Sequence, residues 1–556
     1  MKRVFFFGNG RAEGAGLGKE RLGGKGYGLA EMTALGVPVP PGFTIEAAVS
    51  AQYSGGTDLD GLKSEVAQAL SQVEESAGRK FGDPANPLLV SVRSGARSSM
   101  PGMMDTILNL GLNSQTVKGL AAAAGERFAM DCRRRFLQMY GDVVMNLGKE
   151  EFEHALTEKR KGRGVQSDAE LTAEDLANVV KTYEEIVRSK TGKPFPEDPQ
   201  EQLWGAIGAV FNSWDNKRAR EYRRLHRIPH DWGTAVNVQA MVFGNRGETS
   251  ATGVAFTRDP STGEKRFFGE FLPNAQGEDV VAGIRTPRPL NADGSGISLE
   301  ETMPKAHAEL LRVRDLLEKS FRDMQDLEFT IEDGRLYLLQ TRNGKRTGFA
   351  AVRIASDMVD EGLITEDEAI GRVEPEQLIQ LLAPVFDSVK KSAAVSAGRL
   401  LGKGLPAGPG AASGRIALTA NRAVEMATEG RPVLLVREET SPEDIAGMNA
   451  ASGILTTRGG ATSHAAVVAR GMGKTCVVGA GQIVVDEKKG EIRGGKLSAK
   501  EGEYISIDGT TGEVILGELP TRPSEVLQVV VEKSLAPEKA PVFRAFDRIL
   551  TWADKK

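Results

Sequence analysis

One segment of the chain combines a single histidine with glycine and hydroxyl residues in a pattern that suits phosphoryl transfer. Residues 456–479 read TTRGGATSHAAVVARGMGKTCVVG. The pair Gly459-Gly460 permits a tight turn with positive φ, and the hydroxyl residues that follow can cap a helix. His464 is therefore predicted at a helix N-terminus, where free N–H groups and the helix dipole favour an anion. A histidine in that position resists protonation, so it is a candidate nucleophile. An isolated histidine is more often a polar core residue, but this context favours the nucleophile.

The histidine segment resembles the phosphohistidine domain of the pyruvate, phosphate dikinase family. The family motif runs Gly-Gly-Met-Thr-Ser-His-Ala-Ala-Val-Val-Ala-Arg-Gly-Met-Gly, and only Ala461 departs from it. The resemblance extends over residues 439–445 and 501–508. It implies that His464 is the phosphorylated residue. It also implies that Thr462 stands where a regulatory kinase/phosphorylase modifies part of the family, although a capping or loop hydroxyl is an equally good interpretation.

Groups that suit phosphate binding occur near the N-terminus. Gly23-Gly24-Lys25-Gly26 precede a predicted helix, so backbone amides and the Lys25 ammonium could face a phosphate. The spacing matches neither a Walker A motif nor a GxGxxG fingerprint, which argues against P-loop and Rossmann folds. A predicted strand at residues 88–93 delivers Arg93 into a loop rich in glycine and serine. A guanidinium there could bind phosphate oxygens, or it could be an ordinary surface arginine.

A predicted hairpin carries the residues that suit a metal. Residues 326–331 alternate acidic and apolar side chains, a turn follows at Asp333-Gly334, and a second strand ends at Thr341. Pairing of these strands would bring Glu328 near Gln340, and carboxylate and amide oxygens suit Mg²⁺. Alone, the hairpin could equally be structural.

Together these segments resemble the ATP-grasp nucleotide-binding domain of the same family, over residues 23–42, 90–113, 253–263, 274–287 and 326–347. The resemblance implies contacts of Lys25, Arg93 and Arg342 with ATP phosphates. It implies that four further residues line the nucleotide and metal site: Glu278, Asp326, Glu328 and Gln340. Glu328 and Gln340 are the expected Mg²⁺ ligands. Phosphoenolpyruvate synthase shares the fold and the histidine, but the runs ARSSMPGMMDTILNLGLN and FTRDPSTGE resemble the dikinase.

The elements that must position these residues fall into four predicted segments. Residues 1–345 mix predicted strands and helices and are expected to form the ATP-grasp domain. Residues 346–400 are acidic, helical in periodicity and poor in glycine, and they are interpreted as a helical linker or hinge. Residues 401–517 return to glycine-rich turns between short strands and are expected to form a swivelling β/α phosphohistidine domain, and residues 518–556 a connector. The expected fold class is therefore α/β and α+β multidomain.

Composition narrows the function classes. The 556 residues carry 71 lysines and arginines against 75 acidic residues, a net charge of −4, which argues against nucleic-acid binding. Two cysteines cannot form a disulfide scaffold and favour a reducing, cytoplasmic compartment. No run of about 18 apolar residues occurs, so no membrane span is predicted. The charged runs 133–135 and 217–227 are interpreted as solvated faces, although either run could frame the phosphate site.

The resemblance implies the nucleotide half of the dikinase cycle. ATP and inorganic phosphate would phosphorylate His464, with release of AMP and pyrophosphate, for onward transfer to pyruvate. The family's barrel for phosphoenolpyruvate and pyruvate needs about 250 residues and is expected to be absent here. Either the chain is a shortened protein or a fragment, or a barrel is supplied in trans. One alternative is a truncated, non-catalytic nucleotide-binding or phosphocarrier module that works with a separate barrel chain. Another is a nucleotide sensor without phosphotransfer.

Overall fold

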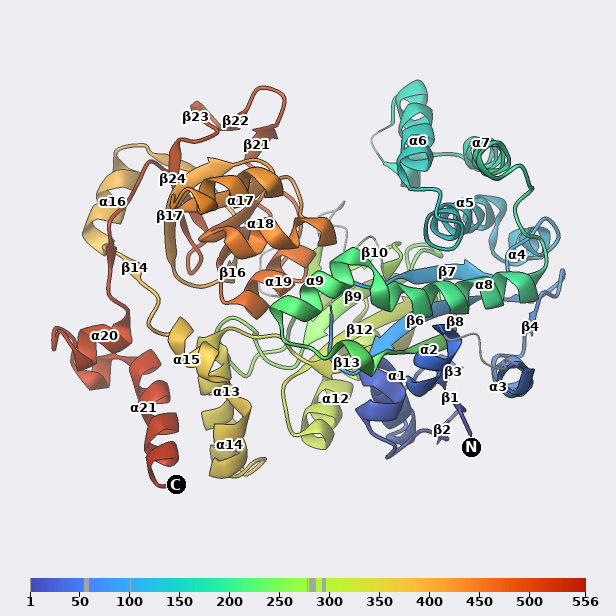
Figure 1. Cartoon of the computed structure of the whole chain (residues 1–556), viewed down its shortest axis with the longest axis horizontal. Helices are drawn as coiled ribbons and strands as arrows, with labels where there is room; N and C mark the ends of the chain where they lie inside the picture. Colours follow the sequence, from blue (N-terminus) through green and yellow to red (C-terminus); the bar gives the residue numbers. More distant parts are fainter. Residues whose placement is uncertain are drawn as a thin grey trace. The chain divides into compact units, whose positions relative to one another are not determined.

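The computed structural model describes residues 2–54, 60–100, 102–165, 167–277, 279, 287–292 and 297–556. The chain divides into two compact units (Figure 1). The first comprises residues 1–250 and 330–342, and the second residues 251–329 and 343–556. The boundaries of the four segments predicted from the sequence (1–345, 346–400, 401–517 and 518–556) remain predictions.

The first unit is built on a six-stranded sheet with the order β2-β1-β3-β8-β6-β7, in which every neighbouring pair is antiparallel. Its strands are β1 (Val4–Gly8), β2 (Arg11–Ala12), β3 (Gly42–Ile45), β6 (Val90–Ala96), β7 (Thr106–Leu110) and β8 (Thr234–Ala240). The short strands β4 (Lys80–Phe81) and β5 (Pro87–Leu88) pair separately. Its α-helices are α1 (Lys19–Ala34), α2 (Ala48–Ser54), α3 (Asp60–Ala77), α4 (Thr116–Ala124), α5 (Glu126–Val143), α6 (Glu150–Arg163), α7 (Ala173–Thr191), α8 (Pro199–Asn212) and α9 (Lys217–Leu225).

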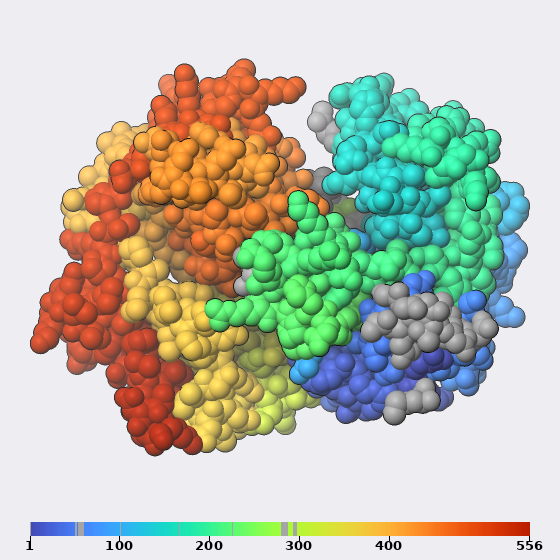
Figure 2. All heavy atoms as spheres, in the orientation of Figure 1, coloured from blue at the N-terminus to red at the C-terminus, as the bar shows by residue number. Residues whose placement is uncertain are grey.

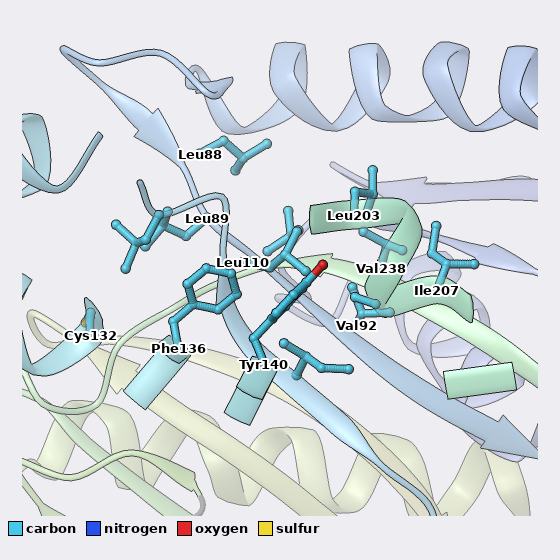
Figure 3. Close-up of a cluster of buried hydrophobic side chains, with 14 of the residues drawn as sticks. Leu88, Leu89, Val92, Leu110, Cys132, Phe136, Tyr140, Leu203, Ile207 and Val238 are labelled. Atoms are coloured by element: carbon cyan, nitrogen blue, oxygen red, sulfur yellow. The ribbon is translucent and has the colours of Figure 1, made fainter. Parts of the chain in front are cut away.

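The core of this unit lies between the sheet and the helices α5 and α8. Figure 3 shows Val92 and Val238 from the sheet facing Leu203 and Ile207 of α8, with Phe136 of α5 beside them. Aromatic rings of α5 pack edge to face, with the ring centroids of Phe136 and Tyr140 5.5 Å apart. The burial of these side chains fixes the sheet from which the phosphate-binding candidates project.

The interpretation of the charged runs as solvated faces is wrong for three of their arginines. Arg133 and Arg134 of α5 are buried, as is Arg223 of α9. Arg133 donates to the carbonyl of Leu112 at 2.6 Å and pairs with Glu184 and Glu197. Buried guanidinium groups need such partners, and those of Arg133 are supplied by residues outside its own helix.

A five-stranded sheet with the order β11-β10-β9-β12-β13 contains strands β9 (Ala251–Phe256), β10 (Phe268–Pro273), β11 (Arg288–Pro289), β12 (Gln325–Glu332) and β13 (Arg335–Asn343). The boundary between the units runs through β12 and β13. The predicted hairpin is therefore present, with its turn at Asp333-Gly334. Helices α11 (Leu299–Thr302) and α12 (Pro304–Phe321) precede it.

Residues 346–400 are largely helical, as expected: α13 (Gly348–Asp360), α14 (Glu366–Arg372), α15 (Pro375–Gln380) and α16 (Ser388–Ser396), with the short strand β14 (Val385–Phe386). Helices α13 and α14 share a hydrophobic cluster with α20 (Glu525–Val530) and α21 (Pro541–Asp554). In the part of the chain that the structure describes, no helix is long and apolar enough to cross a membrane.

An eight-stranded sheet, β15-β25-β24-β17-β18-β19-β20-β16, forms the rest of the second unit. Its strands are β15 (Leu400–Lys403), β16 (Leu405–Gly408), β17 (Ala411–Ala417), β18 (Val433–Arg437), β19 (Gly453–Thr456), β20 (Thr475–Val478), β24 (Tyr504–Asp508) and β25 (Glu513–Leu516). Three helices connect its four parallel central strands: α17 (Ala420–Thr428), α18 (Ile445–Ala450) and α19 (His464–Met472). The helices α17 and α18 lie on the face seen in Figure 2, in orange. Two smaller sheets complete the second unit. One contains β21 (Ile483–Asp486), β22 (Glu491–Gly494) and β23 (Leu497–Lys500), and in the other β26 (Thr521–Arg522) pairs with β14.

Candidate active site

His464 is the first residue of α19, as the sequence predicts. Strands β18 and β19 are parallel neighbours, so the loops that follow them leave the sheet at the same edge. Loops at the carboxyl ends of such strands are where open α/β sheets place their ligand sites. The loop after β19 supplies His464 and the loop after β18 supplies Thr440. The Thr440 Oγ1 lies 3.0 Å from the His464 Nδ1.

The His464 ring is held at one nitrogen only. The side chain is 8% exposed, and its Nε2 has no hydrogen-bond partner among the residues that the structure describes. Burial lowers the pKa of His464 to about 4, although Asp444 and Glu443 oppose this shift. The imidazole is therefore neutral at pH 7. In the tautomer in which the Nδ1–H donates to Thr440, the Nε2 carries the lone pair that a nucleophile needs.

The loop that leads into α19 is held by a carboxylate. Gly459 has φ +89°, which a glycine adopts without strain. The Glu270 Oε1 on β10 accepts the Ala461 N–H at 3.2 Å, and its Oε2 accepts the Thr462 hydroxyl at 3.2 Å. Burial raises the pKa of Glu270, and the hydrogen bonds from Ala461 and Thr462 work in the opposite direction. The hydroxyl of Thr462 is thus committed to Glu270 rather than exposed.

Arg470 braces the same loop from within α19. It is 1% exposed, and its Nη2 donates to the carbonyl of Ala461 at 2.8 Å. Its guanidinium lies 5.7 Å from the ring centroid of Phe256. Nearby Cys476 is fully buried, and burial raises the pKa of its thiol to about 12. Cys476 is therefore a packing residue.

The glycine segment of the first unit lies within α1, which is kinked at Gly23 (φ 65°, ψ 171°). The predicted helix thus restarts immediately after Gly23, and Lys25 is half-buried in its first turn. A Cβ on Gly23 would lie 1.6 Å from the Gly95 carbonyl oxygen, and one on Gly26 would lie 2.7 Å from Thr44. These two glycines therefore allow the helix to approach the sheet closely.

Arg93 joins three strands of the first unit. It is buried, and its Nη2 donates to the side chain of Gln239 on β8 and, at 3.0 Å, to the carbonyl of Leu339 on β13. The residue that follows Leu339 is Gln340, which is also buried. The structure therefore brings Arg93 together with the segment of β13 that carries Gln340 and Arg342. The positive charge of Arg342 reaches Tyr222 of α9, where it works against the burial that raises the pKa of that phenol to about 12.

Asp326 and Glu328 belong to the part of β12 in the second unit. They are two residues apart on one face of the strand, and the other face carries Leu327 and Phe329, both fully buried. Carboxylates on one face are hard oxygen donors that fit Mg²⁺. Within the described residues no group of three His, Cys, Asp or Glu side chains could hold a metal. The expected proximity of Glu328 and Gln340 stays a prediction, and Glu278 lies outside the described residues.

Comparison with known proteins adds a decisive observation. A family model described as pyruvate phosphate dikinase, AMP/ATP-binding domain, matches residues 60–305 and 295–363, which together exceed half of the chain. The chain belongs to this dikinase family. A second model, described as PEP-utilising enzyme, mobile domain, matches residues 430–512 and so includes both Thr440 and His464.

Curated dikinases are similar to this chain along most of its length. The pyruvate, phosphate dikinase of Rhizobium meliloti (strain 1021) is 53% identical over 562 residues, covering 100% of this chain and 60% of that protein. That of Clostridium symbiosum is 52% identical over 98% of this chain and 60% of its own length. Pyruvate, phosphate dikinase 1 of Arabidopsis thaliana, described as chloroplastic, is 50% identical over 100% and 55%. The chain therefore spans less than two thirds of the length of these dikinases.

Two residues of the site, Thr440 and Glu270, were not predicted from the sequence. Thr440 lies in a segment that resembles the dikinase family, but nothing in that segment indicates that its hydroxyl reaches a histidine 24 residues later. Glu270 lies on a strand 191 residues before Ala461. Only the sheet topology brings these residues to the loop, so a single sequence offers no direct signal for either.

Proposed function

We propose that this chain performs the nucleotide half of the pyruvate, phosphate dikinase reaction. ATP and inorganic phosphate would phosphorylate His464 and yield AMP and pyrophosphate, and the phosphoryl group would pass on to pyruvate. The observation that carries the proposal is the His464 ring at the start of a helix: it is neutral and buried, Thr440 holds its Nδ1, and its Nε2 has no hydrogen-bond partner among the described residues.

The proposed chemistry is that implied by the resemblance to the dikinase family. The Nε2 lone pair attacks the β-phosphorus of ATP, the bond from that phosphorus to the oxygen of AMP breaks, and His464 carries a pyrophosphoryl group. Inorganic phosphate then attacks the terminal phosphorus and leaves as pyrophosphate, with one phosphoryl group on the histidine. The imidazole gains positive charge as the first bond forms. The Thr440 oxygen, which accepts the Nδ1–H, and the nearby Asp444 would stabilise that charge.

In this proposal the first unit supplies positive charge to the nucleotide. Lys25, Arg93 and Arg342 would bind the phosphates and keep ATP oriented for attack. Asp326 and Glu278 would line the nucleotide site. Mg²⁺, held by Glu328 and Gln340, would neutralise phosphate oxygens when bound with ATP.

The remaining predictions extend the same proposal. Residues 346–400 would act as the hinge of a swivelling phosphohistidine domain, and a barrel in trans would bind phosphoenolpyruvate and pyruvate. Thr462 is the proposed target of a regulatory kinase/phosphorylase. Because its hydroxyl is buried against Glu270, such an enzyme would reach it only after the loop has left β10.

The test is product formation with the purified chain. ATP, Mg²⁺ and inorganic phosphate should yield AMP and pyrophosphate up to one equivalent of protein, with no AMP when phosphate and Mg²⁺ are withheld. His464→Ala should bind ATP with unchanged affinity and release neither product. Nucleotide binding without AMP release from the unaltered chain would instead support the non-catalytic binding module.

A further inference from the structure

The loop that precedes His464 already holds a carboxyl group, and that group belongs to the protein. Glu270 reaches from β10 to the loop and takes two of its donors, the Ala461 N–H and the Thr462 hydroxyl. The backbone N–H of Thr462 also acts on this carboxyl group and opposes the rise in its pKa that burial causes. Donors arranged around one carboxylate immediately before a helix start are the arrangement that binds phosphate groups in many proteins.

The fit of the carboxylate is close. A Cβ on Gly460 would lie 2.3 and 2.7 Å from the two Glu270 carboxylate oxygens. Only a glycine leaves room for the carboxylate at that position. Because the atoms in conflict are the end of a side chain, a methyl group at residue 460 would displace the carboxylate and leave the backbone in place.

The same donors lie within reach of any group on His464. Thr462 precedes His464 by two residues, which limits the separation of their Cα atoms to about 7 Å. A phosphoryl group on His464 carries about two negative charges, and like charges in a partly desolvated site repel strongly. The carboxylate of Glu270 and the phosphoryl group therefore cannot both use these donors favourably.

We propose that residues 460–462 form one shared anion site, occupied by Glu270 while His464 is unmodified and by the phosphoryl group once His464 carries it. Phosphorylation thereby displaces Glu270 and releases the loop from β10. Glu270 is thus a positioning residue that ties the loop down only before the chemistry. This inference rests on the proposed function for the natural source of the phosphoryl group.

The first test measures how fast His464 accepts a phosphoryl group from phosphoramidate, which transfers the group to nitrogen and releases ammonia without using the nucleotide site. Intact-protein mass spectrometry near pH 8 follows the adduct. Glu270→Gln, which removes the charge, and Gly460→Ala, which displaces it, should both be labelled about tenfold faster than the unaltered protein. Glu264→Gln, an exposed carboxylate on the segment before β10, is the matched control and should be labelled at the unaltered rate. Equal rates in all four proteins would overturn the inference.

The second test measures release directly. Hydrogen exchange of peptides covering residues 458–466 and 268–273 should accelerate about tenfold when the unaltered protein is phosphorylated. In Gly460→Ala the same peptides should exchange rapidly in both states, so phosphorylation should change their rates less than about twofold. Unchanged protection of the loop in the phosphorylated, unaltered protein would contradict displacement. Because phosphoramidate bypasses ATP, a failure of ATP to phosphorylate His464 would count against the proposed function alone.

Discussion

The loop before His464 (residues 459–463) and the glycine segment of α1 (residues 23–26) are both rich in glycine, but the missing side chains have different roles in the two regions. In α1, Gly23 faces the backbone oxygen of Gly95, so its missing side chain permits a fixed approach of helix to sheet. In the histidine loop, Gly460 faces the end of the Glu270 side chain, which can move. The comparison teaches that Gly23 serves a fixed packing contact beside the proposed phosphate-binding residues, whereas Gly460 faces a contact that can be replaced.

The two regions also hold their reactive groups differently. Arg93 is tied to two other strands through its guanidinium, so its position is set by the whole sheet. His464 makes one ring contact, with Thr440, and leaves its second nitrogen without a partner in the described part of the chain. A binding group gains from being fixed, whereas a nucleophile needs an open atom.

The largest expected effect is that of Gly23→Ala, which tests whether Gly23 permits the close approach of α1 to the sheet. The new Cβ would meet a backbone oxygen, and φ is +65°, so overpacking and backbone strain together should lower the free energy of unfolding of the first unit by about 4 kcal/mol. Denaturant unfolding in a Trp552→Phe background reports on this unit alone, because the other three tryptophans lie in it: Trp204, Trp214 and Trp232.

Gly16→Ala is the matched control for that measurement. Gly16 has φ +77° but nothing within 4 Å of the position of a Cβ. This variant should lose only the strain of the left-handed backbone, about 1–2 kcal/mol. Equal losses at the two positions would show that close approach to the sheet is not what Gly23 provides.

For the histidine region, the expected effect is a dependence of the free energy of unfolding on pH. The pKa of His464 is lowered to about 4 in the folded protein, against about 6.5 in an unfolded chain. The unfolded state therefore binds more protons than the folded state between these two pH values. The contribution of His464 to the free energy of unfolding is thus complete above pH 6.5, falls as the pH is lowered, and is lost as the pH falls through 4. His464→Gln should remove up to about 3 kcal/mol of this pH dependence. Unfolding followed by circular dichroism at pH 4.5, 5.5 and 7 measures it, and parallel curves for the two proteins would argue against a buried, neutral His464.

Thr440→Val should slow phosphorylation of His464 by ATP about tenfold, which corresponds to the loss of one hydrogen bond of about 1.4 kcal/mol. The substitution keeps the shape of the side chain but no longer fixes the ring tautomer. Thr440→Ser should restore most of the rate because it keeps the hydroxyl. A slow Thr440→Ser enzyme, measured by the rate of AMP formation, would indicate that packing and not the hydroxyl matters.

The smallest expected effect is that of Gly460→Ala on stability. Because only the Glu270 side chain has to move, the free energy of unfolding should fall by less than about 1 kcal/mol, in contrast to Gly23→Ala. Unfolding followed by circular dichroism measures this change. A loss as large as that of Gly23→Ala would remove the distinction between the two glycines.

The histidine region was largely predictable because its residues are contiguous. The turn, the helix start at His464 and the flanking strands all follow from a run of 24 residues. Partners that come from distant elements were not predictable, since Thr440 and Glu270 reach the loop only through the sheets. The prediction that residues 133–135 form a solvated face was wrong for the same reason, because the partners that allow Arg133 to be buried lie outside its own helix. Residues expected to line the nucleotide site are spread over several elements, and in the described part of the chain Arg93 meets the segment of β13 that carries Gln340.

The account depends most directly on His464 as the phosphorylated residue. Intact-protein mass spectrometry at neutral to alkaline pH, after incubation with ATP, Mg²⁺ and inorganic phosphate, tests this claim for the unaltered chain and for His464→Ala. The account predicts an acid-labile gain of one phosphoryl group, mapped by peptide analysis to residues 459–470, and no gain in the variant. An adduct that persists in His464→Ala, or no adduct while ATP still binds, would contradict it.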